Sequence, residues 1–353
     1  MKVAVIGAGN GGQAMAGHFA YLGHQVNLYS RDLQKLQPVI RNGGVHLKEA
    51  INGFGKLHLI TDDLAMAVSD VEIIMITTVA DAHKSIALKL APLLKQGQIV
   101  VLNPGRTFGA LEFKNIISNH TNKRIYIAET QSLLYACRAE ENGEVRIIGL
   151  KNKLPVAAIP SSDTDDVLKV LNVLSQSFIK ARNVFETSLD NIGCIFHPSI
   201  VLFNVASIER GERFYFYNDI TPGIASFLES IDKERLEIGW ALGIDLLSVN
   251  EWISFSYEGI EGETLCEKMK NNPAYYKILA PVALNSRLLT EDIPTGVLPL
   301  IEIARLLNVP TPLLSSVYNI VSGLLKTDFK QEGRTLRNLG LENIDIKDFI
   351  RKI

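Results

Sequence analysis

The chain has 353 residues, of which 47% are hydrophobic and 21% charged, so it is long enough for two domains with buried cores. The 36 basic and 38 acidic residues nearly cancel, which excludes the basic surface typical of nucleic-acid-binding proteins. The three cysteines form no CxxC pair, so we predict neither a disulfide framework nor a metal site, and we place the chain in the reducing cytoplasm. No apolar run approaches the ~18 residues of a membrane span, and no signal peptide is predicted.

The first half of the chain alternates between strand and helix patterns. Residues 2–6 are an apolar run typical of a strand buried on both faces, and a glycine-rich turn and a helix over 13–22 follow. A strand over 25–29 then completes a βαβ unit. Further strands are predicted over 71–77, 98–102, 124–128, 144–150, 154–159 and 180–185, and helices over 85–94 and 165–178. This alternation predicts a doubly wound, mostly parallel α/β sheet of the Rossmann type.

The second half has a helical pattern. Helices are predicted over 191–209, 224–242, 298–307 and 313–326. We therefore predict a dinucleotide-binding domain over 1–185 and an all-α substrate domain over 186–353, with the charged tail covering the helical domain.

The glycine-rich turn has the spacing GxGxxG between a strand and a helix, the context in which this motif binds a dinucleotide. Gly7 permits the tight turn, Gly9 lets backbone amides approach a pyrophosphate, and Gly12 lets the helix pack on the sheet. A glycine-rich turn without a ligand is the alternative. The predicted cofactor contacts, from this turn and from two later strand ends, are Gly7, Gly9, Asn10, Gly12, Thr78 and Asn103.

The end of the second predicted strand indicates which dinucleotide binds. An acidic residue that would hold the ribose of NAD is expected there, about 20 residues after the glycines, but the chain has Ser30 followed by Arg31. An arginine can pair with the 2′-phosphate of NADP, so the sequence favours NADPH and adds Ser30 and Arg31 to the cofactor contacts. NAD remains the alternative if Arg31 stacks on adenine or Asp32 binds the ribose.

Three later segments carry candidate chemistry. His197 precedes a proline near the start of a predicted helix, and an unperturbed histidine titrates near pH ~6.5, which suits proton transfer. Arg287 and Asp292 lie in a segment with proline and glycine, where an arginine could bind a carboxylate and an aspartate could orient a histidine. Residues 128–138 follow a strand end, the ligand-binding edge of such sheets. A core histidine, a surface ion pair and packing are the respective alternatives.

Six segments together resemble the opine dehydrogenases, of the octopine and nopaline dehydrogenase type. The resemblance is greatest to the bacterial branch that includes N-(1-D-carboxyethyl)-L-norvaline dehydrogenase, and it runs in order from residue 2 to about 341. The segments are GAGNGG at 7–12, LNPG at 102–105, AETQSLLYACR at 128–138, NIGCIFHP at 191–198, RLLTEDIPTG at 287–296 and DFKQEGRT at 328–335.

The resemblance implies an enzyme that condenses the amino group of an amino acid with a 2-keto acid such as pyruvate, followed by reduction of the imine with NAD(P)H. It implies that His197 and Asp292 are the catalytic pair, that Arg287 binds a substrate carboxylate, and that Gln131 and Cys137 line the substrate pocket. It also implies a homodimer. The alternatives are an enzyme of the ketopantoate reductase or glycerol-3-phosphate dehydrogenase type, and a non-catalytic protein that senses NADP.

Overall fold

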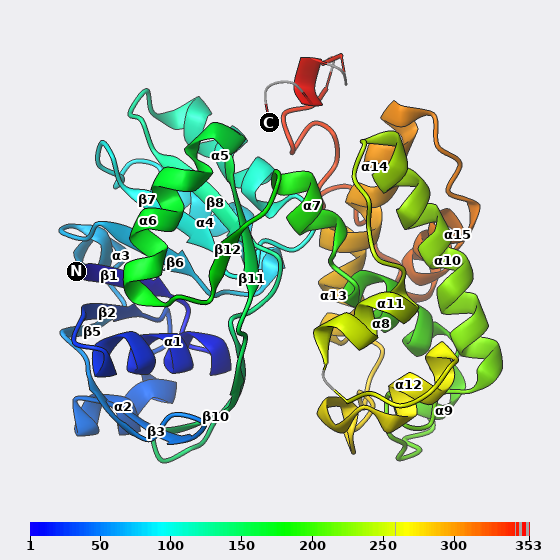
Figure 1. Cartoon of the computed structure of the whole chain (residues 1–353), viewed down its shortest axis with the longest axis horizontal. Coiled ribbons are helices and arrows are strands. Elements are labelled where there is room, and N and C mark those ends of the chain that lie inside the picture. Colours follow the sequence, from blue (N-terminus) through cyan, green and yellow to red (C-terminus); the bar gives the residue numbers. More distant parts are fainter. Residues whose placement is uncertain (258, 343, 346–347, 351–352) are drawn as a thin grey trace. The chain divides into compact units, whose positions relative to one another are not determined.

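The computed structural model describes residues 1–257, 259–342, 344, 345, 348–350 and 353 (Figure 1). The chain divides into two compact units, Met1–Ser188 with Arg351–Ile353, and Leu189–Ile350. The predicted division into 1–185 and 186–353 falls slightly earlier in the chain. Residues 343, 346, 347, 351 and 352 of the predicted charged tail lie outside the described residues.

The first unit contains an eight-stranded sheet in the order β12-β11-β8-β7-β6-β1-β2-β5. The strands from β8 to β5 run parallel, whereas β11 is antiparallel to β8, and β12 is parallel to β11. The predicted Rossmann-like sheet is therefore confirmed, with a reversed pair at one edge. The strands are β1 (Lys2–Ile6), β2 (Gln25–Tyr29), β5 (Leu59–Thr61), β6 (Ile73–Ile76), β7 (Ile99–Leu102), β8 (Tyr126–Thr130), β11 (Leu154–Ile159) and β12 (Phe178–Lys180).

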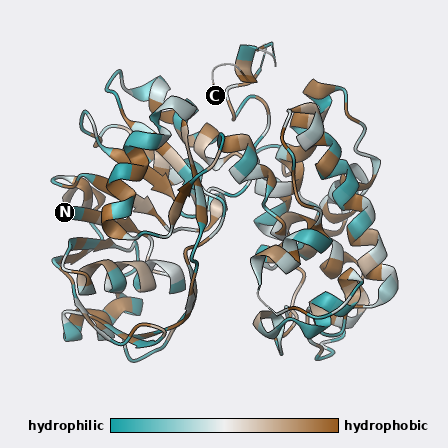
Figure 2. Cartoon of the chain, in the orientation of Figure 1, coloured by the Kyte–Doolittle hydropathy of each residue, from teal (hydrophilic) through white to brown (hydrophobic). Residues whose placement is uncertain are grey.

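Helices accompany this sheet because its central strands are apolar on both faces. All four residues of β6 and all four of β7 are buried, and the strands of the sheet are brown in the hydropathy colouring of Figure 2. Such strands need cover on both sides. The helices of this unit are α1 (Asn10–Tyr21), α2 (Gln37–Asn42), α3 (Leu64–Val68), α4 (His83–Leu90), α5 (Gly109–His120) and α6 (Thr164–Leu174).

A second, four-stranded sheet in the order β4-β3-β10-β9 packs against α1. Only β10 was predicted from the sequence. A Cβ on Gly55 would overlap the carbonyl of Gly17 in α1, so two glycines let the strand and the helix approach closely. The strands are β3 (Gly44–Glu49), β4 (Gly53–Lys56), β9 (Tyr135–Ala139) and β10 (Glu144–Leu150).

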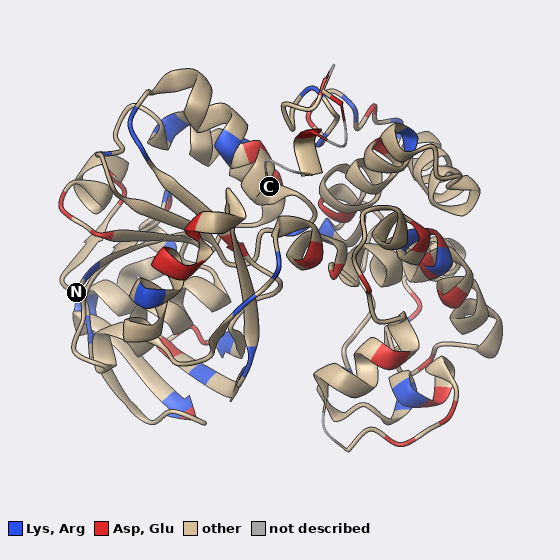
Figure 3. Cartoon of the chain, turned by 45° about the horizontal axis from the view of Figure 1, so that its top comes forward, with Lys and Arg blue, Asp and Glu red and all other residues tan. Residues whose placement is uncertain are grey.

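The second unit is helical, as predicted. In Figure 3, acidic and basic residues are interspersed along the elements of both units. The helices after the first sheet are α7 (Val184–Leu189), α8 (Gly193–Leu202), α9 (Val205–Glu209), α10 (Pro222–Ala241), α11 (Val249–Ser256), α12 (Leu265–Asn271), α13 (Arg287–Thr290), α14 (Leu298–Leu307) and α15 (Pro312–Leu325), with a π-helical turn η5 (Ile293–Val297) between α13 and α14.

Two predicted elements were wrong near the start of this region. The strand predicted over 180–185 ends at Lys180, because the Asn183 side chain accepts a hydrogen bond from the Phe185 backbone N–H at 3.0 Å and starts α7. The helix predicted over 191–209 is interrupted at Asn204, whose side-chain amide donates to the Ile200 carbonyl at 2.8 Å. In both places, an asparagine side chain makes a hydrogen bond to the backbone, and this bond competes with the regular hydrogen bonds of the strand or helix.

Candidate active site and cofactor site

The glycine turn lies at the carboxyl end of β1, the edge of a doubly wound sheet where ligands bind. Gly7 has φ +108°, and a Cβ there would lie 2.9 Å from the Thr78 methyl carbon. A Cβ on Gly12 would overlap the Gly7 carbonyl oxygen, whereas the space around the Cβ position of Gly9 is open within 4 Å. No side chain caps the N-terminus of α1, so its first N–H groups and its dipole can bind a phosphate beside Gly9.

Two threonines of β6's carboxyl end lie beside this turn. Thr77 Oγ1 donates to the Gly7 carbonyl at 2.9 Å and fixes the turn. Thr78 Oγ1 is buried and has no hydrogen-bond partner among the described residues. Because buried hydroxyls are usually hydrogen-bonded, this one is available to a ligand. The turn, the helix N-terminus and Thr78 together fit a bound dinucleotide.

The turn after β2 uses its serine and aspartate internally. Ser30 Oγ donates to the Asp32 carbonyl at 3.0 Å and accepts from the Asp32 N–H at 3.2 Å. The Asp32 carboxylate accepts from the Gln34 N–H at 3.0 Å and lies 3.7 Å from Lys35 Nζ. Arg31 is exposed, and within the described residues its guanidinium makes no hydrogen bond or ion pair. Arg31 is therefore the side chain of this turn that is available to a ligand.

The two asparagines predicted to contact the cofactor each make side-chain hydrogen bonds within the first unit. Asn10 Oδ1 accepts from the Ala139 N–H at 3.1 Å, which fastens α1 to the end of β9. Asn103 is fully buried; its amide donates to Thr130 Oγ1 at 2.9 Å and accepts from the Leu134 N–H at 3.2 Å. Both side chains hold the segment after β8 in place, and their contact with a cofactor stays a prediction.

The predicted pocket-lining residues lie on separate elements of the first unit. Gln131 follows β8, and its N–H donates to the Pro155 carbonyl at 3.0 Å. Cys137 lies within β9 opposite Ile147 and packs against the hydrophobic core. Burial raises the pKa of the Cys137 thiol to about 11, so the thiol is neutral and not a nucleophile at pH 7. Their contact with substrate stays a prediction.

A third polar residue of the same segment, Glu129, is fully buried at the carboxyl end of the sheet. Its carboxylate accepts from Thr187 Oγ1 at 2.7 Å, Ser188 Oγ at 2.5 Å and the Ala110 N–H at 2.8 Å. These donors satisfy an acceptor-only carboxylate. Glu129 thereby anchors the last residues of the first unit on its sheet.

The helical unit brings His197 and Asp292 together from positions 95 residues apart. His197 Nδ1 lies 2.7 Å from Asp292 Oδ2, and His197 Nε2 lies 2.9 Å from the Tyr217 hydroxyl. The side chains of His197 and Asp292 are 18% and 4% exposed. An aspartate on Nδ1 fixes the imidazole orientation and stabilises its protonated form, which suits a general acid–base pair.

The local sequence explains how these two elements meet. Cys194 and His197 are three residues apart, so they share one face at the start of α8. A Cβ on Gly296 would overlap Cβ of Cys194, so this glycine lets η5 lie directly against α8. Asp292 immediately precedes η5, and π-turns are frequent at functional sites.

The segment DFKQEGRT supports this π-turn from the other side. Arg334 is fully buried, its backbone N–H donates to the Pro294 carbonyl at 3.0 Å, and its guanidinium donates to the Thr295 carbonyl at 3.4 Å. A Cβ on Gly333 would overlap the Phe329 carbonyl. The motif therefore acts on the site indirectly, by fixing the turn that follows Asp292.

Arg287 is the first residue of α13, which packs against α8. Its side chain is 62% exposed, and Nε lies 3.1 Å from Glu291 Oε2. Within the described residues, the Arg287 guanidinium makes this ion pair through Nε. Its two terminal amino groups can therefore still bind a carboxylate. The structure thus brings Arg287 to the helices that carry the histidine pair, and its substrate contact stays a prediction.

Tyr217 is the member of the site that the sequence reasoning missed. Tyr217 lies in an aromatic run, Tyr215-Phe216-Tyr217, which matches no catalytic motif and is equally typical of packing between helices. The signal that could have identified it is this run of aromatic residues soon after the histidine motif. No local spacing rule relates it to His197, however, because the rest of α8, helix α9 and a loop separate the two residues along the chain.

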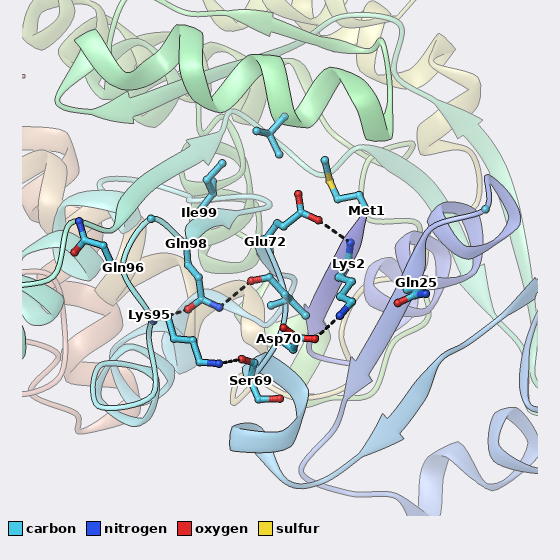
Figure 4. Close-up of a pocket in the computed structure, with 14 residues that line it drawn as sticks. Met1, Lys2, Gln25, Ser69, Asp70, Glu72, Lys95, Gln96, Gln98 and Ile99 are labelled. Atoms are coloured by element: carbon cyan, nitrogen blue, oxygen red, sulfur yellow. Dashed lines mark hydrogen bonds and ion pairs between the residues drawn. The ribbon is translucent and has the colours of Figure 1, made fainter.

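A hollow of about 810 Å³ lies at the opposite, amino ends of the strands, and Figure 4 shows the residues that line it. Apolar and polar side chains line it, and several of the polar ones bond to one another or to backbone, such as Lys2 with Asp70 and Gln98 with the Val68 carbonyl. Ligands of doubly wound sheets bind at the carboxyl ends, so this hollow is not the cofactor site.

Within the described residues, no group of His, Cys, Asp and Glu side chains could hold a metal ion. None of the described helices combines the length and apolar character of a membrane span.

Comparison with known proteins matches both halves of the chain. Residues 180–325 match the family model described as "NAD/NADP octopine/nopaline dehydrogenase, alpha-helical domain". Residues 2–109 match the NAD binding domain of 6-phosphogluconate dehydrogenase. The chain is 38% identical over 344 residues to an opine dehydrogenase of Arthrobacter sp. (strain 1C), covering 97% of this chain and 95% of the relative.

Solved structures share the fold. Octopine dehydrogenase with NADH and L-arginine has a TM-score of 0.81 at 21% identity, covering 96% of both chains. The same enzyme with NADH and pyruvate has a TM-score of 0.80 at 20% identity, covering 98% of this chain and 97% of that one. Yersinopine dehydrogenase with NADP⁺ bound has a TM-score of 0.76 at 14% identity, covering 100% of this chain and 98% of that one.

Proposed function

The chain belongs to the opine dehydrogenase family, and we propose that it joins the amino group of an amino acid to a 2-keto acid, pyruvate in the first place, using NADPH. It is an NAD(P)-dependent oxidoreductase of the opine dehydrogenase type. The observation that carries the proposed mechanism is the hydrogen bond between His197 and Asp292 in the helical unit. The octopine dehydrogenase structures with arginine and with pyruvate support the two classes of substrate.

The chemistry assigned to the chain's own residues is proton transfer and orientation. The amine adds to the keto carbon, and the resulting carbinolamine loses water to form an imine. His197, protonated and held by Asp292, supplies the proton with which the hydroxyl leaves, and it accepts a proton in the reverse direction. Arg287 binds the keto acid's carboxylate and positions the carbon that reacts. Reduced nicotinamide, when bound, supplies the hydride that converts the imine to the secondary amine.

We propose NADPH as the preferred cofactor, with NADH as the alternative. The glycine turn and Thr78 would hold the parts that the two cofactors share. The support for NADPH is Arg31, which is exposed at the end of β2, whereas Asp32 is committed to its own turn. Both NADH and NADP⁺ occur in the structural neighbours.

The test is a comparison of substrates at saturating NADPH. We expect cofactor oxidation only when pyruvate and an amino acid are both present, and a panel of apolar, acidic and basic amino acids identifies the preferred amine. Turnover with ketopantoate alone, or with pyruvate alone, would instead indicate a 2-hydroxy acid dehydrogenase. Tight NADPH binding without any turnover would favour a sensor.

Two further properties, the homodimer implied by the resemblance and the cytoplasmic location inferred from the cysteines, stay predictions. We propose a homodimer, which light scattering of the purified protein measures directly. We propose a cytoplasmic location, which fractionation of the source cells tests.

A further inference from the structure

The Tyr217 hydroxyl contacts Nε2 of His197, the ring nitrogen that faces away from Asp292. Asp292 Oδ2, the imidazole and the Tyr217 hydroxyl form a continuous series, with distances of 2.7 Å at Nδ1 and 2.9 Å at Nε2. A phenol can donate to the neutral imidazole and accept from the protonated one. The contact can therefore persist in both protonation states of His197.

The structure fixes the Tyr217 ring from two sides. Residues on either side of Tyr217 are hydrogen-bonded to the loop at 277–278. The Phe216 N–H donates to the Ile278 carbonyl at 2.7 Å, and the Lys277 N–H donates to the Asn218 side chain at 2.8 Å. The ring stacks on Tyr275 at a centroid distance of 4.1 Å and an angle of 20°. Tyr217 is 9% exposed. The hydroxyl is therefore held at Nε2 by backbone pairing and by stacking.

Tyr217 belongs to a cluster of aromatic rings with Tyr275 and Tyr257. Burial raises the pKa of Tyr275 well above its usual value, and it also raises the pKa of Tyr257, whose ring meets Tyr275 edge-on at 5.4 Å. A charged oxygen in the same cluster would lack solvation. A proton that passes through Tyr217 must therefore leave and be replaced in one step.

We propose that Tyr217 is a catalytic residue that relays the proton between His197 Nε2 and the substrate oxygen. This inference rests on the proposed function. In dehydration, the carbinolamine C–O bond breaks, and its electron pair leaves with the oxygen. That oxygen takes the Tyr217 hydroxyl proton, while the phenol oxygen takes the Nε2 proton of protonated His197. The nitrogen lone pair forms the C=N bond, so water and a protonated imine result, His197 becomes neutral, and Tyr217 ends as a phenol.

The relay also explains how His197 can act on the substrate although its Nε2 already contacts the Tyr217 hydroxyl. A general base must lie within hydrogen-bond distance of the proton it moves, directly or through one intervening group. His197 is only 18% exposed and already has a partner on each ring nitrogen. The Tyr217 hydroxyl extends the reach of Nε2 without moving the imidazole from Asp292.

The experiment compares two variants that each delete one hydroxyl. Tyr217→Phe keeps the ring and its stack, and we expect kcat to fall roughly 100-fold in both directions, with little change in KM. The solvent isotope effect should also change: a proton inventory that curves in the unmodified enzyme, because two protons move, should become linear. Tyr257→Phe is the matched control, two rings farther from His197 than Tyr217 is, and should keep both kcat and the curved inventory.

The outcomes separate this inference from the proposed function. Absence of amino-acid-dependent turnover in the unmodified protein would overturn both. Normal turnover there with an unchanged kcat in Tyr217→Phe would overturn the relay alone, as would a lower kcat with an unchanged proton inventory. If Tyr217→Phe does not fold, 3-fluorotyrosine at position 217 keeps the ring and the hydroxyl but makes the phenol more acidic. A kcat and inventory unaffected by that replacement would also overturn the relay.

Discussion

The glycine turn of the first unit and the histidine pair of the helical unit are built on different principles. The turn is made by neighbouring residues, because Gly7 to Gly12 form one strand-to-helix connection with the helix N-terminus attached. The histidine pair joins α8 to a π-turn 95 residues later and depends on Gly296 and Arg334 to bring the two together. The dinucleotide motif is therefore encoded mainly by neighbouring residues, with Thr77 fixing the turn from β6, whereas the proposed proton transfer depends on the tertiary packing of the helices.

The substitution with the largest expected effect is His197→Ala, which tests whether proton transfer can be lost while cofactor binding is kept. Loss of the acid–base group should lower kcat by roughly 100-fold or more. Cofactor affinity should barely change, because the glycine turn belongs to the other unit. Steady-state kinetics and a fluorescence titration of NADPH measure the two effects separately. His58→Ala, at an exposed position of the first unit, is the control. Near-normal turnover in His197→Ala would remove this residue from the mechanism.

A smaller effect is expected from Asp292→Asn. The amide keeps the size of the side chain but cannot stabilise the positive charge on His197, and a hydrogen bond to a charged group contributes about 1.5–3 kcal/mol. That corresponds to a loss in kcat of roughly ten- to hundredfold. Asp245→Asn, at an exposed position of the same unit, controls for a general charge effect. Wild-type kinetics in Asp292→Asn would contradict the pairing of His197 with Asp292 as a functional unit.

The same contrast explains what could be predicted from sequence. The periodicity of buried strands and the glycine spacing gave the Rossmann-like sheet and the position of the turn, since both depend on near neighbours. Strands β3 and β4 were missed because β4 carries Gly53 and Gly55, which weaken a strand pattern. Strand β3 has six residues, of which only three are buried, so its periodicity is weak.

Within the site, residue type was easier to predict than the partner of each residue. Asn103 lies after a strand end, where a cofactor contact is reasonable, yet its amide is used by Thr130 and Leu134. Tyr217 carries no motif, yet it binds His197 directly. In both cases, the hydrogen-bond partner comes from another segment, and only the folded chain determines which polar group is free for a ligand.

Arg287→Lys tests whether the exposed arginine of α13 binds a carboxylate. Lysine keeps the charge but loses the planar fork that binds a carboxylate through two hydrogen bonds. We expect KM for the keto acid to rise roughly tenfold, with a small change in kcat, since about 1.5 kcal/mol of binding is lost. Arg305→Lys is a matched control: Arg305 is 68% exposed and also lies near a glutamate of its own helix, at 3.4 Å. An unchanged KM in Arg287→Lys would move the carboxylate-binding group elsewhere.

The smallest effect concerns the cofactor, because Arg31 is exposed and solvent weakens its charge interactions. The 2′-phosphate of NADPH carries nearly two negative charges, and an arginine can bind it through charge-assisted hydrogen bonds. We expect NADPH to bind about tenfold more tightly than NADH at low salt, and Arg31→Ala to remove most of that difference. Lys35→Ala is the control: the Lys35 side chain is 85% exposed and lies near the same turn, so its removal should leave the preference for NADPH largely intact.

Raising the ionic strength should reduce the difference in affinity between NADPH and NADH in the unmodified protein, since exposed charges are screened. Equal binding of the two cofactors, measured by titration at one salt concentration, would contradict the role of Arg31. The assignment of proton transfer to His197 would stand, because that pair lies in the helical unit and makes no use of the 2′-phosphate.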